Sequence, residues 1–193
     1  DVDGVLADYM LPYTTLLAQL SKSHVFTPYG HRDSLTWDPE CPIDVGVTEW
    51  RMAQSSARDI IQYRPNWWAT LPVLASKADV SAVHKLSYET DLYFVTSRFG
   101  DGAKLDTEFW IRHHLEIIPT VIITGITARK GRFASAIDAT HMLDDKPQNL
   151  MDVQWSSEAD GRILKMPYNS PHSDLGPGAY VESVEEFVEW VLS

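Results

Sequence analysis

The feature that most constrains the fold is an alternation of short apolar runs with helical segments over residues 74–193. The runs predict strands at 92–95, 119–124, 140–145 and 162–166, and the run at 119–124 is rich in β-branched residues. Apolar periodicity predicts helices near 77–88 and 103–115, from Lys130, and in a last segment capped by Ser183 and Glu186. Strands separated by helices at this spacing imply a parallel sheet covered on both faces. The predicted fold class is therefore α/β.

Residues 9–73 follow a different pattern. From Tyr9 the apolar residues recur at helical spacing, and a second helix is expected at about 48–60. Proline and glycine interrupt the segment between them, and Arg64-Pro65-Asn66 ends the second helix. We therefore expect a small, mostly helical insert at 9–73 and a core made of 1–8 and 74–193.

Polar residues occur where the predicted strands end. These residues are Asp1 and Asp3, Thr96 and Ser97, and Asp144 and Asp145. In a parallel sheet ligands bind at the carboxyl ends of the strands, so these three segments are expected to meet in one crevice. A strand leading into Asp1 is also expected. Asp1 and Asp3 would lie on the same side of an extended backbone, and two such carboxylates require a cation or a shared proton.

Composition excludes several classes of function. A formal net charge of -11 argues against a broad surface for nucleic acid or anionic membrane, although a local cationic pocket could still hold a small phosphorylated ligand. Cys41 is the only cysteine, so an internal disulfide is excluded and a cytoplasmic location is favoured. Neither a membrane span nor a signal peptide is recognised, so we expect no membrane partner.

Four motifs stand in a recognisable order. They are Asp1-Val2-Asp3-Gly4-Val5, Val95-Thr96-Ser97, a lysine opening a helix at Lys130, and Leu143-Asp144-Asp145-Lys146-Pro147. This arrangement resembles the haloacid dehalogenase (HAD) superfamily of phosphotransferases over nearly the whole chain. With Pro65-Asn66-Trp67-Trp68 and Leu71-Pro72, it is more narrowly similar to the 5'(3')-deoxyribonucleotidase family. The resemblance implies a Rossmann-like HAD core with a helical cap inserted after the first strand.

The resemblance also assigns roles to residues. Asp1 would be the nucleophile that forms an aspartyl-phosphate, and Asp3 would be the general acid and base. Thr96, Ser97 and Lys130 would bind the phosphate. A Mg²⁺ ion would be held by Asp1, the carbonyl of Asp3 and Asp144, while Asp145 would either ligate it or orient the other ligands. The expected activity is dephosphorylation of (deoxy)nucleoside 5'-monophosphates.

The insert would recognise the substrate beyond its phosphate. Tyr9 lies at a position that is aromatic in the family, Trp67 and Trp68 replace paired phenylalanines, and Arg98 replaces a proline. Aromatic faces stack on nucleobases, and Arg98 could bind phosphate or a sugar hydroxyl. Trp37 is a further candidate for the pocket. Trp67 or Trp68 could instead pack the cap against the core.

Several of these assignments have a second interpretation. Thr96-Ser97 could be a plain helix cap, Asp144-Asp145 a surface turn, and Arg129 or Arg132 could replace Lys130 as the phosphate partner. The substrate could be another small phosphometabolite, such as a sugar phosphate. The chain could also be a non-catalytic phosphate-binding module. A polynucleotide end is disfavoured by the acidic charge, and a homodimer is one of the oligomeric states left open.

Overall fold

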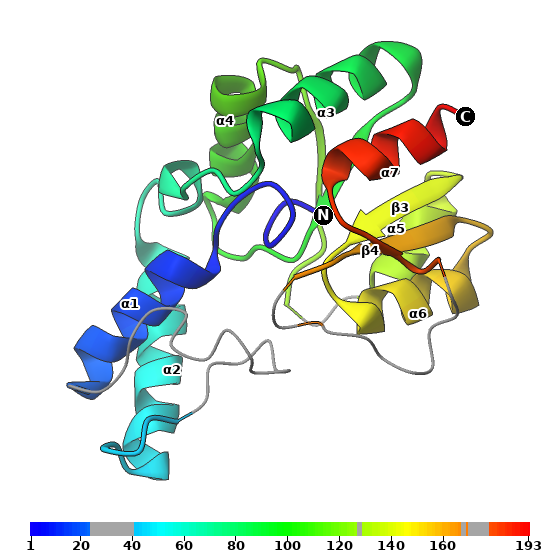
Figure 1. Cartoon of the computed structure of the whole chain (residues 1–193). Coiled ribbons are helices and arrows are strands. Elements are labelled where there is room, and N and C mark those ends of the chain that lie inside the picture. The colour runs from blue at the N-terminus through cyan, green and yellow to red at the C-terminus, as the bar shows by residue number, and fades with distance from the viewer. Residues whose placement is uncertain (24–40, 127–128, 167–168, 170–177) are drawn as a thin grey trace.

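The structure is a computed structural model that describes residues 1–23, 41–126, 129–166, 169 and 178–193. Its elements are α1 (Met10–Ser21), α2 (Val47–Tyr63), the short 3-10 helix η1 (Trp68–Thr70), α3 (Lys77–Glu89), β1 (Tyr93–Thr96), α4 (Ala103–Leu115), β2 (Thr120–Ile123), α5 (Lys130–Ala136), β3 (His141–Asp144), α6 (Pro147–Ser156), β4 (Asp160–Leu164), β5 (Tyr180–Val181) and α7 (Val184–Val191). All strand pairs in these ladders are parallel and helices flank them, so the predicted α/β class is confirmed (Figure 1).

The described strands form two sheets rather than one. β1 pairs with β2, while β3, β4 and β5 form the second sheet in that order. The first residues, expected to follow a strand, form a turn in which the amides of Leu6 and Ala7 both donate to the carbonyl of Val2, at 2.8 and 2.9 Å. Within residues 1–8 the β-type pairing is limited to isolated bridges, from Asp3 to Ala7 and from Ala7 to Val73. The positive φ of Gly4, 77°, closes this turn.

Helices cover the second sheet on both sides. In Figure 1, α7 lies above β3 and β4, and α6 lies below them. Helix α7 buries Val184, Phe187 and Val188, as its predicted apolar stripe requires. The hydroxyl of Ser183 caps it by accepting from the amide of Glu186 at 3.0 Å. The other half of the predicted capping box differs, because the Glu186 carboxylate accepts from the amide of Glu182 at 2.7 Å.

The insert leaves and returns to the core at one place. The amide of Asp8 donates to the carbonyl of Pro72, and the amide of Leu74 donates to that of Leu6, both at 2.8 Å. Between these points α1 and α2 pack against each other and extend away from the α/β part (Figure 1). Throughout the described chain, each helix is too short or too polar to cross a membrane.

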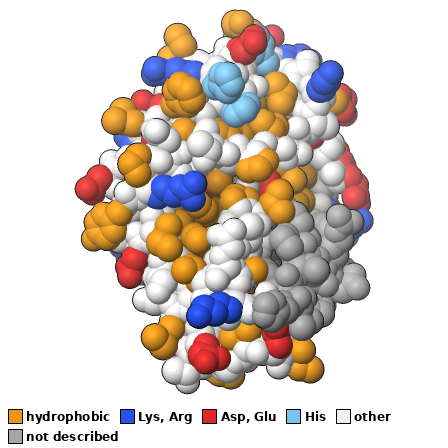
Figure 2. Space-filling model, turned by 90° about the vertical axis from the view of Figure 1, so that its left-hand side faces the viewer, with side chains coloured by type: hydrophobic (Ala, Val, Ile, Leu, Met, Phe, Trp, Pro, Cys, Tyr) orange, Lys and Arg blue, Asp and Glu red, His pale blue; other side chains and the backbone are white. Residues whose placement is uncertain are grey.

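One face of the molecule is seen in the space-filling view. Figure 2 shows hydrophobic side chains interspersed with single charged ones over that face. Exposed apolar side chains such as Met52, Leu105 and Phe109 are 59 to 72% accessible. Scattered exposed hydrophobic residues are normal on a protein surface and do not by themselves indicate a binding site.

A glycine sets the close contact between α5 and α6. A Cβ atom added at Gly131 would overlap the backbone carbonyl of Asp152. We predict that Gly131→Ala lowers the free energy of unfolding by about 1–3 kcal/mol, because helix backbones rather than a flexible side chain must move apart. Urea unfolding would measure this loss. Gly102→Ala is the control, with its nearest neighbour at 3.7 Å and an expected loss below about 1 kcal/mol. Equal losses in the two variants would contradict the close-packing explanation.

Candidate functional site

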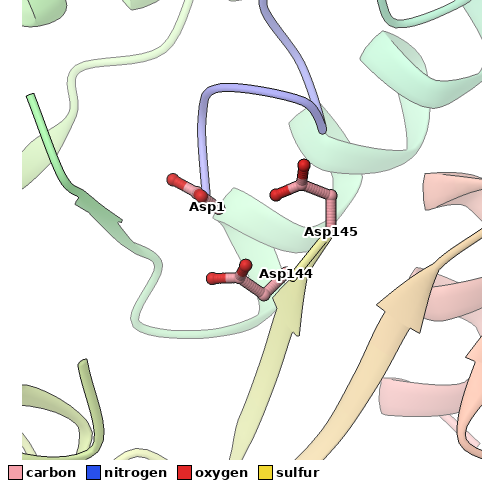
Figure 3. Close-up of side chains that lie close together, drawn as sticks. All are labelled: Asp1, Asp144 and Asp145. Carbon is pink, nitrogen blue, oxygen red and sulfur yellow. The ribbon is translucent and has the colours of Figure 1, made fainter. Parts of the chain in front are cut away.

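Three carboxylates gather at the carboxyl end of β3. Asp144 is the last residue of β3, Asp145 follows it, and Asp1 reaches the same place from the amino-terminal turn (Figure 3). Each contributes an oxygen, and these oxygens all lie within 4.8 Å of one another. Asp144 and Asp145 are only 2% and 0% exposed. The structure therefore brings together two of the predicted segments that are more than 140 residues apart in sequence.

Lys130 supplies a cation to this cluster. Its Nζ lies 2.6 Å from Oδ2 of Asp1 and 2.7 Å from Oδ2 of Asp144. Helix α5 begins at Lys130, and the side chain is 1% exposed. Arg129 and Arg132, the other two candidates for this role, are exposed. A buried ammonium between two carboxylates neutralises charge that would otherwise be costly to bury.

The remaining polar atoms around Asp144 are also paired. Its Oδ1 accepts from the amide of Lys146 and from Nδ2 of Asn149, both at 2.9 Å. Sequence reasoning missed Asn149, although its position in the first turn of α6, five residues after Asp144, was an available signal. It also missed Asn169, whose Nδ2 donates to the carbonyls of Asp145 and Leu164 at 2.7 Å. Asn169 comes from a distant loop, and its sequence neighbours gave no such signal.

Burial and charge act on Asp144 in opposite directions. Burial alone would raise the pKa of its carboxyl. The positive charge of Lys130, and hydrogen bonds from Lys130 and Asn149, lower the pKa below its ordinary value of 3.8. The backbone nitrogen of Asp1 donates to the carbonyl of Leu143 at 2.6 Å.

Asp3 lies in a separate hydrogen-bonded group. Its carboxylate accepts from Nε and Nη2 of Arg98, the closest contact being 2.8 Å, and from Oγ1 of Thr96 at 3.3 Å. Arg98 is fully buried, and its Nη1 donates to Oγ1 of Thr107 at 2.9 Å. Thr107, on α4, was not anticipated. Because arginine has donors only, the Asp3 oxygens are the acceptors in these contacts with Arg98.

The hydroxyls at the end of β1 contact the end of β2. Oγ of Ser97 lies 3.2 Å from Oγ1 of Thr124, which also donates to the carbonyl of Thr96 at 3.3 Å. Thr96 is buried and its hydroxyl is directed to Asp3, while Ser97 is partly exposed. The structure therefore places Thr96 beside the predicted general acid.

The aromatic residues form a packed layer. Trp68 is 4% exposed, stacks on Tyr9 with ring centroids 5.6 Å apart, and lies 5.1 Å from the Arg98 guanidinium. Tyr9 stacks on Tyr13 on the adjoining helix α1 at 5.0 Å, and Trp67 is 5% exposed. This burial favours the packing role that the sequence left open for both tryptophans. Trp37 lies outside the described residues.

The donor set fits a hard divalent cation. The groups of Asp1, Asp144 and Asp145 offer only carboxylate oxygens, the ligands that Mg²⁺ prefers. The Asp3 carboxylate is not a member of this cluster of close oxygens, so any part it plays would come through another atom such as its carbonyl. The residues present therefore fit Mg²⁺.

No family model and no curated protein matches this chain. Function is therefore inferred from its own residues and their geometry.

Lys130→Met tests the electrostatic balance of the carboxylate cluster. We predict that the substitution lowers the free energy of unfolding by about 3–5 kcal/mol at pH 7, because the carboxylates of Asp1 and Asp144 stay buried without their cation. In the parent protein the lowered pKa of Asp144 gives stability that is present above pH 3.8 and lost at lower pH. In Lys130→Met, burial without the lysine cation should raise the pKa of the Asp144 carboxyl. The free energy of unfolding of this variant should therefore increase as the pH falls from 7 towards 4. Urea unfolding across this range measures both effects.

Lys165→Met is the matched control. Lys165 pairs with Glu182 at 2.6 Å, but the two side chains are 50% and 71% exposed. Its removal should cost less than about 1 kcal/mol and leave the shape of the pH dependence unchanged. A similar small loss for Lys130→Met would show that the buried cation is not required.

A double-mutant cycle tests the buried pair of Arg98 and Asp3. Arg98→Met should cost about 3–5 kcal/mol, since it leaves the Asp3 carboxylate without its partner. Adding Asp3→Asn to Arg98→Met should raise the free energy of unfolding by at least about 1 kcal/mol relative to Arg98→Met alone, because a neutral amide needs no counter-charge. Urea unfolding of all four proteins gives the coupling energy.

The same cycle on Arg162 and Asp160 is the control for an exposed pair, in which the Asp160 side chain is 58% exposed. Its coupling should stay below about 1 kcal/mol. If the double variant loses the sum of the two single losses in free energy of unfolding, within about 0.5 kcal/mol, a strong interaction between Arg98 and Asp3 is ruled out.

Proposed function

We propose that this protein is a Mg²⁺-dependent phosphomonoesterase of the HAD type that dephosphorylates (deoxy)nucleoside 5'-monophosphates through an aspartyl-phosphate. The observation that carries the proposal is the buried group of Asp1, Lys130 and Asp144, with Asp145 beside it. It combines a carboxylate nucleophile, a fixed cation and oxygen ligands at the carboxyl end of a parallel strand. That is the part of an α/β fold where ligands bind.

The first half of the reaction uses Asp1 and Asp3. A carboxylate oxygen of Asp1 attacks phosphorus, and the bond from phosphorus to the ester oxygen breaks. The leaving oxygen takes a proton from Asp3. Lys130 lies at 2.6 Å from Asp1 and stabilises negative charge on the transferring group. Bound Mg²⁺ would be held by Asp1, Asp144 and Asp145 and would neutralise charge on the phosphoryl oxygens.

The second half regenerates the protein. The Asp3 carboxylate removes a proton from a water molecule, whose oxygen attacks phosphorus and displaces the Asp1 carboxylate as phosphate forms. Arg98 donates hydrogen bonds to both carboxylate oxygens of Asp3. A substrate phosphate competes for the same guanidinium. Arg98 would then contact phosphate, in keeping with its place beside Thr96 and Trp68.

The insert would act as the cap that encloses the substrate. It leaves the core at Asp8, a few residues after Asp1 and Asp3, and returns to it at Leu74. Tyr9 would border the bound base, with its ring held by stacking on Tyr13 and Trp68. The burial of both tryptophans favours a second candidate, a phosphatase for a small phosphometabolite without a base, such as a sugar phosphate.

Phosphate release from a panel of nucleotides and sugar phosphates, with Mg²⁺ and with excess EDTA, tests the proposal. We predict Mg²⁺-dependent turnover with kcat/KM highest for nucleoside 5'-monophosphates. Asp1→Asn should lower kcat at least about 10³-fold, because the amide is a poor nucleophile. Acid-stable trapping of labelled phosphate on the parent protein should be absent from the variant.

Asp160→Asn is the matched control, since this carboxylate is exposed and paired only with Arg162 in the described ion pairs. It should leave kcat unchanged. Undiminished activity of Asp1→Asn would exclude Asp1 as nucleophile. Higher kcat/KM for sugar phosphates would select the second candidate, and nucleotide binding without hydrolysis would indicate a non-catalytic module.

A further inference from the structure

A fully buried arginine lies near two carboxylates beyond the end of β1. Arg98 donates from Nε and Nη2 to the carboxylate of Asp3, with a shortest contact of 2.8 Å. The second carboxylate is Asp106, a buried residue in the first turn of α4. Burial raises the pKa of the Asp106 carboxyl above its ordinary value of 3.8, and the charge of Arg98 opposes this rise. Arg98 is therefore close enough to Asp106 for the two charges to interact.

Arg98 nevertheless pairs with one of these acids. Among the ion pairs of the described residues, its guanidinium binds Asp3 and not Asp106. Both carboxylates attract a cation, so charge alone does not decide between them. The direction of the guanidinium requires a further contact, one that depends on geometry.

The hydroxyl of Thr107 supplies such a contact. Thr107 is fully buried in α4, and its Oγ1 donates to the carbonyl of Ala103, one turn earlier, at 2.5 Å. A hydroxyl has one hydrogen and two lone pairs, so this bond leaves its oxygen as an acceptor. Oγ1 accepts from Nη1 of Arg98 at 2.9 Å. Helix α4 thus presents an uncharged acceptor of fixed direction to the nitrogen of Arg98 that does not bind Asp3.

The ring of Trp68 holds the guanidinium from another side. The Cζ atom of Arg98 lies 5.1 Å from the centroid of this ring, and Nε1 of Trp68 donates to the carbonyl of Phe99 at 2.9 Å. An aromatic face attracts a cation, but it does not select which N–H group points to which acceptor. The hydrogen bond to Thr107 makes this selection.

We propose that Thr107 is a positioning residue whose hydroxyl directs Arg98 to Asp3 rather than to Asp106. Arg98 then holds the Asp3 carboxylate in the orientation from which it exchanges protons with the leaving group and with water. The inference rests on the proposed phosphatase function, in which Asp3 is the general acid and base. Without the hydroxyl, Nη1 loses its partner in a fully buried place, and the guanidinium turns towards the second acid.

Thr107→Val tests the role in turnover, because it removes the hydroxyl and keeps a side chain of similar shape. We predict that kcat for the best nucleoside monophosphate falls at least about tenfold while KM stays within about twofold, since Asp3 is displaced and the binding groups remain. Thr107→Ser keeps the hydroxyl and should retain at least about half of the parent kcat. Thr107→Ala also lacks the hydroxyl, and it makes the same test if Thr107→Val does not fold.

Thr14→Val is the matched control. Thr14 is buried in α1, and its hydroxyl also donates to the carbonyl four residues earlier, that of Met10, at 2.6 Å. None of the hydrogen bonds described for Thr14 reaches an arginine. This substitution should leave kcat unchanged.

The Nε–H group of Arg98 gives a readout that needs no turnover. Its NMR signal is assigned by its absence from Arg98→Lys. In the parent protein this proton should exchange slowly with water, because Nε donates to both oxygens of Asp3 in a buried place. Exchange should become at least about tenfold faster in Thr107→Val and stay slow in Thr107→Ser and Thr14→Val.

A double variant tests the choice between the two acids. Adding Asp106→Asn to Thr107→Val removes the competing charge, so Arg98 should return to Asp3. Exchange of the Arg98 Nε–H should then slow again, and kcat should rise relative to Thr107→Val alone. Absence of both recoveries would overturn the selection between Asp3 and Asp106.

Parent values of kcat and of Arg98 exchange in Thr107→Val would overturn the proposal. Equal losses of kcat in Thr107→Val and Thr14→Val would also overturn it, because they would reflect helix packing alone. Absence of phosphate release from every protein, the parent included, would reject the proposed function instead. The exchange of the Arg98 Nε–H would still decide whether Thr107 directs the guanidinium to Asp3.

Discussion

The buried ammonium of Lys130 is the interaction on which the site depends. Its 2.6 and 2.7 Å contacts tie the amino-terminal turn to the end of β3, and α5 is held in place through its first residue. Three carboxylates in so small a volume would repel one another without a cation. Gly131, the next residue, lets the backbone of α5 approach that of α6 closely.

The two neighbouring acids pair with different buried cations. Asp1 is bound to Lys130, while Asp3 is bound to Arg98, which follows the end of β1. The turn through Gly4 lets residues this close in sequence belong to two charge groups. Arg98 also lies over Trp68, so the acid Asp3, the end of β1 and the aromatic layer of the insert share one side chain. Arg98 therefore connects the insert to Asp3.

The elements of the α/β part were largely predictable, because apolar periodicity and β-branched runs are local properties. The helix at 77–88 and the strand runs at 119–124 and 140–145 agree with α3, β2 and β3 to within a few residues. The single sheet was not observed among the described strands, because strand pairing depends on contacts between distant parts of the chain that no local pattern specifies. Strand β5 was missed because two residues give no periodic signal.

By itself, the sequence identified the residues that form the buried cluster and the strand that ends at Asp144. Asp1, Lys130, Asp144 and Asp145 were identified from motifs whose spacing is encoded locally. Tertiary structure alone decided which cation meets which acid, because contacts such as Lys130 with Asp1 and Arg98 with Asp3 join residues that are far apart in the sequence. In the folded chain Lys130 is buried beside the acids, while Arg129 and Arg132 are exposed. The fold also brings three hydrogen-bond partners to the site that the sequence did not indicate, namely Asn149, Asn169 and Thr107. Burial is a property of the packed chain, and no local pattern specifies it.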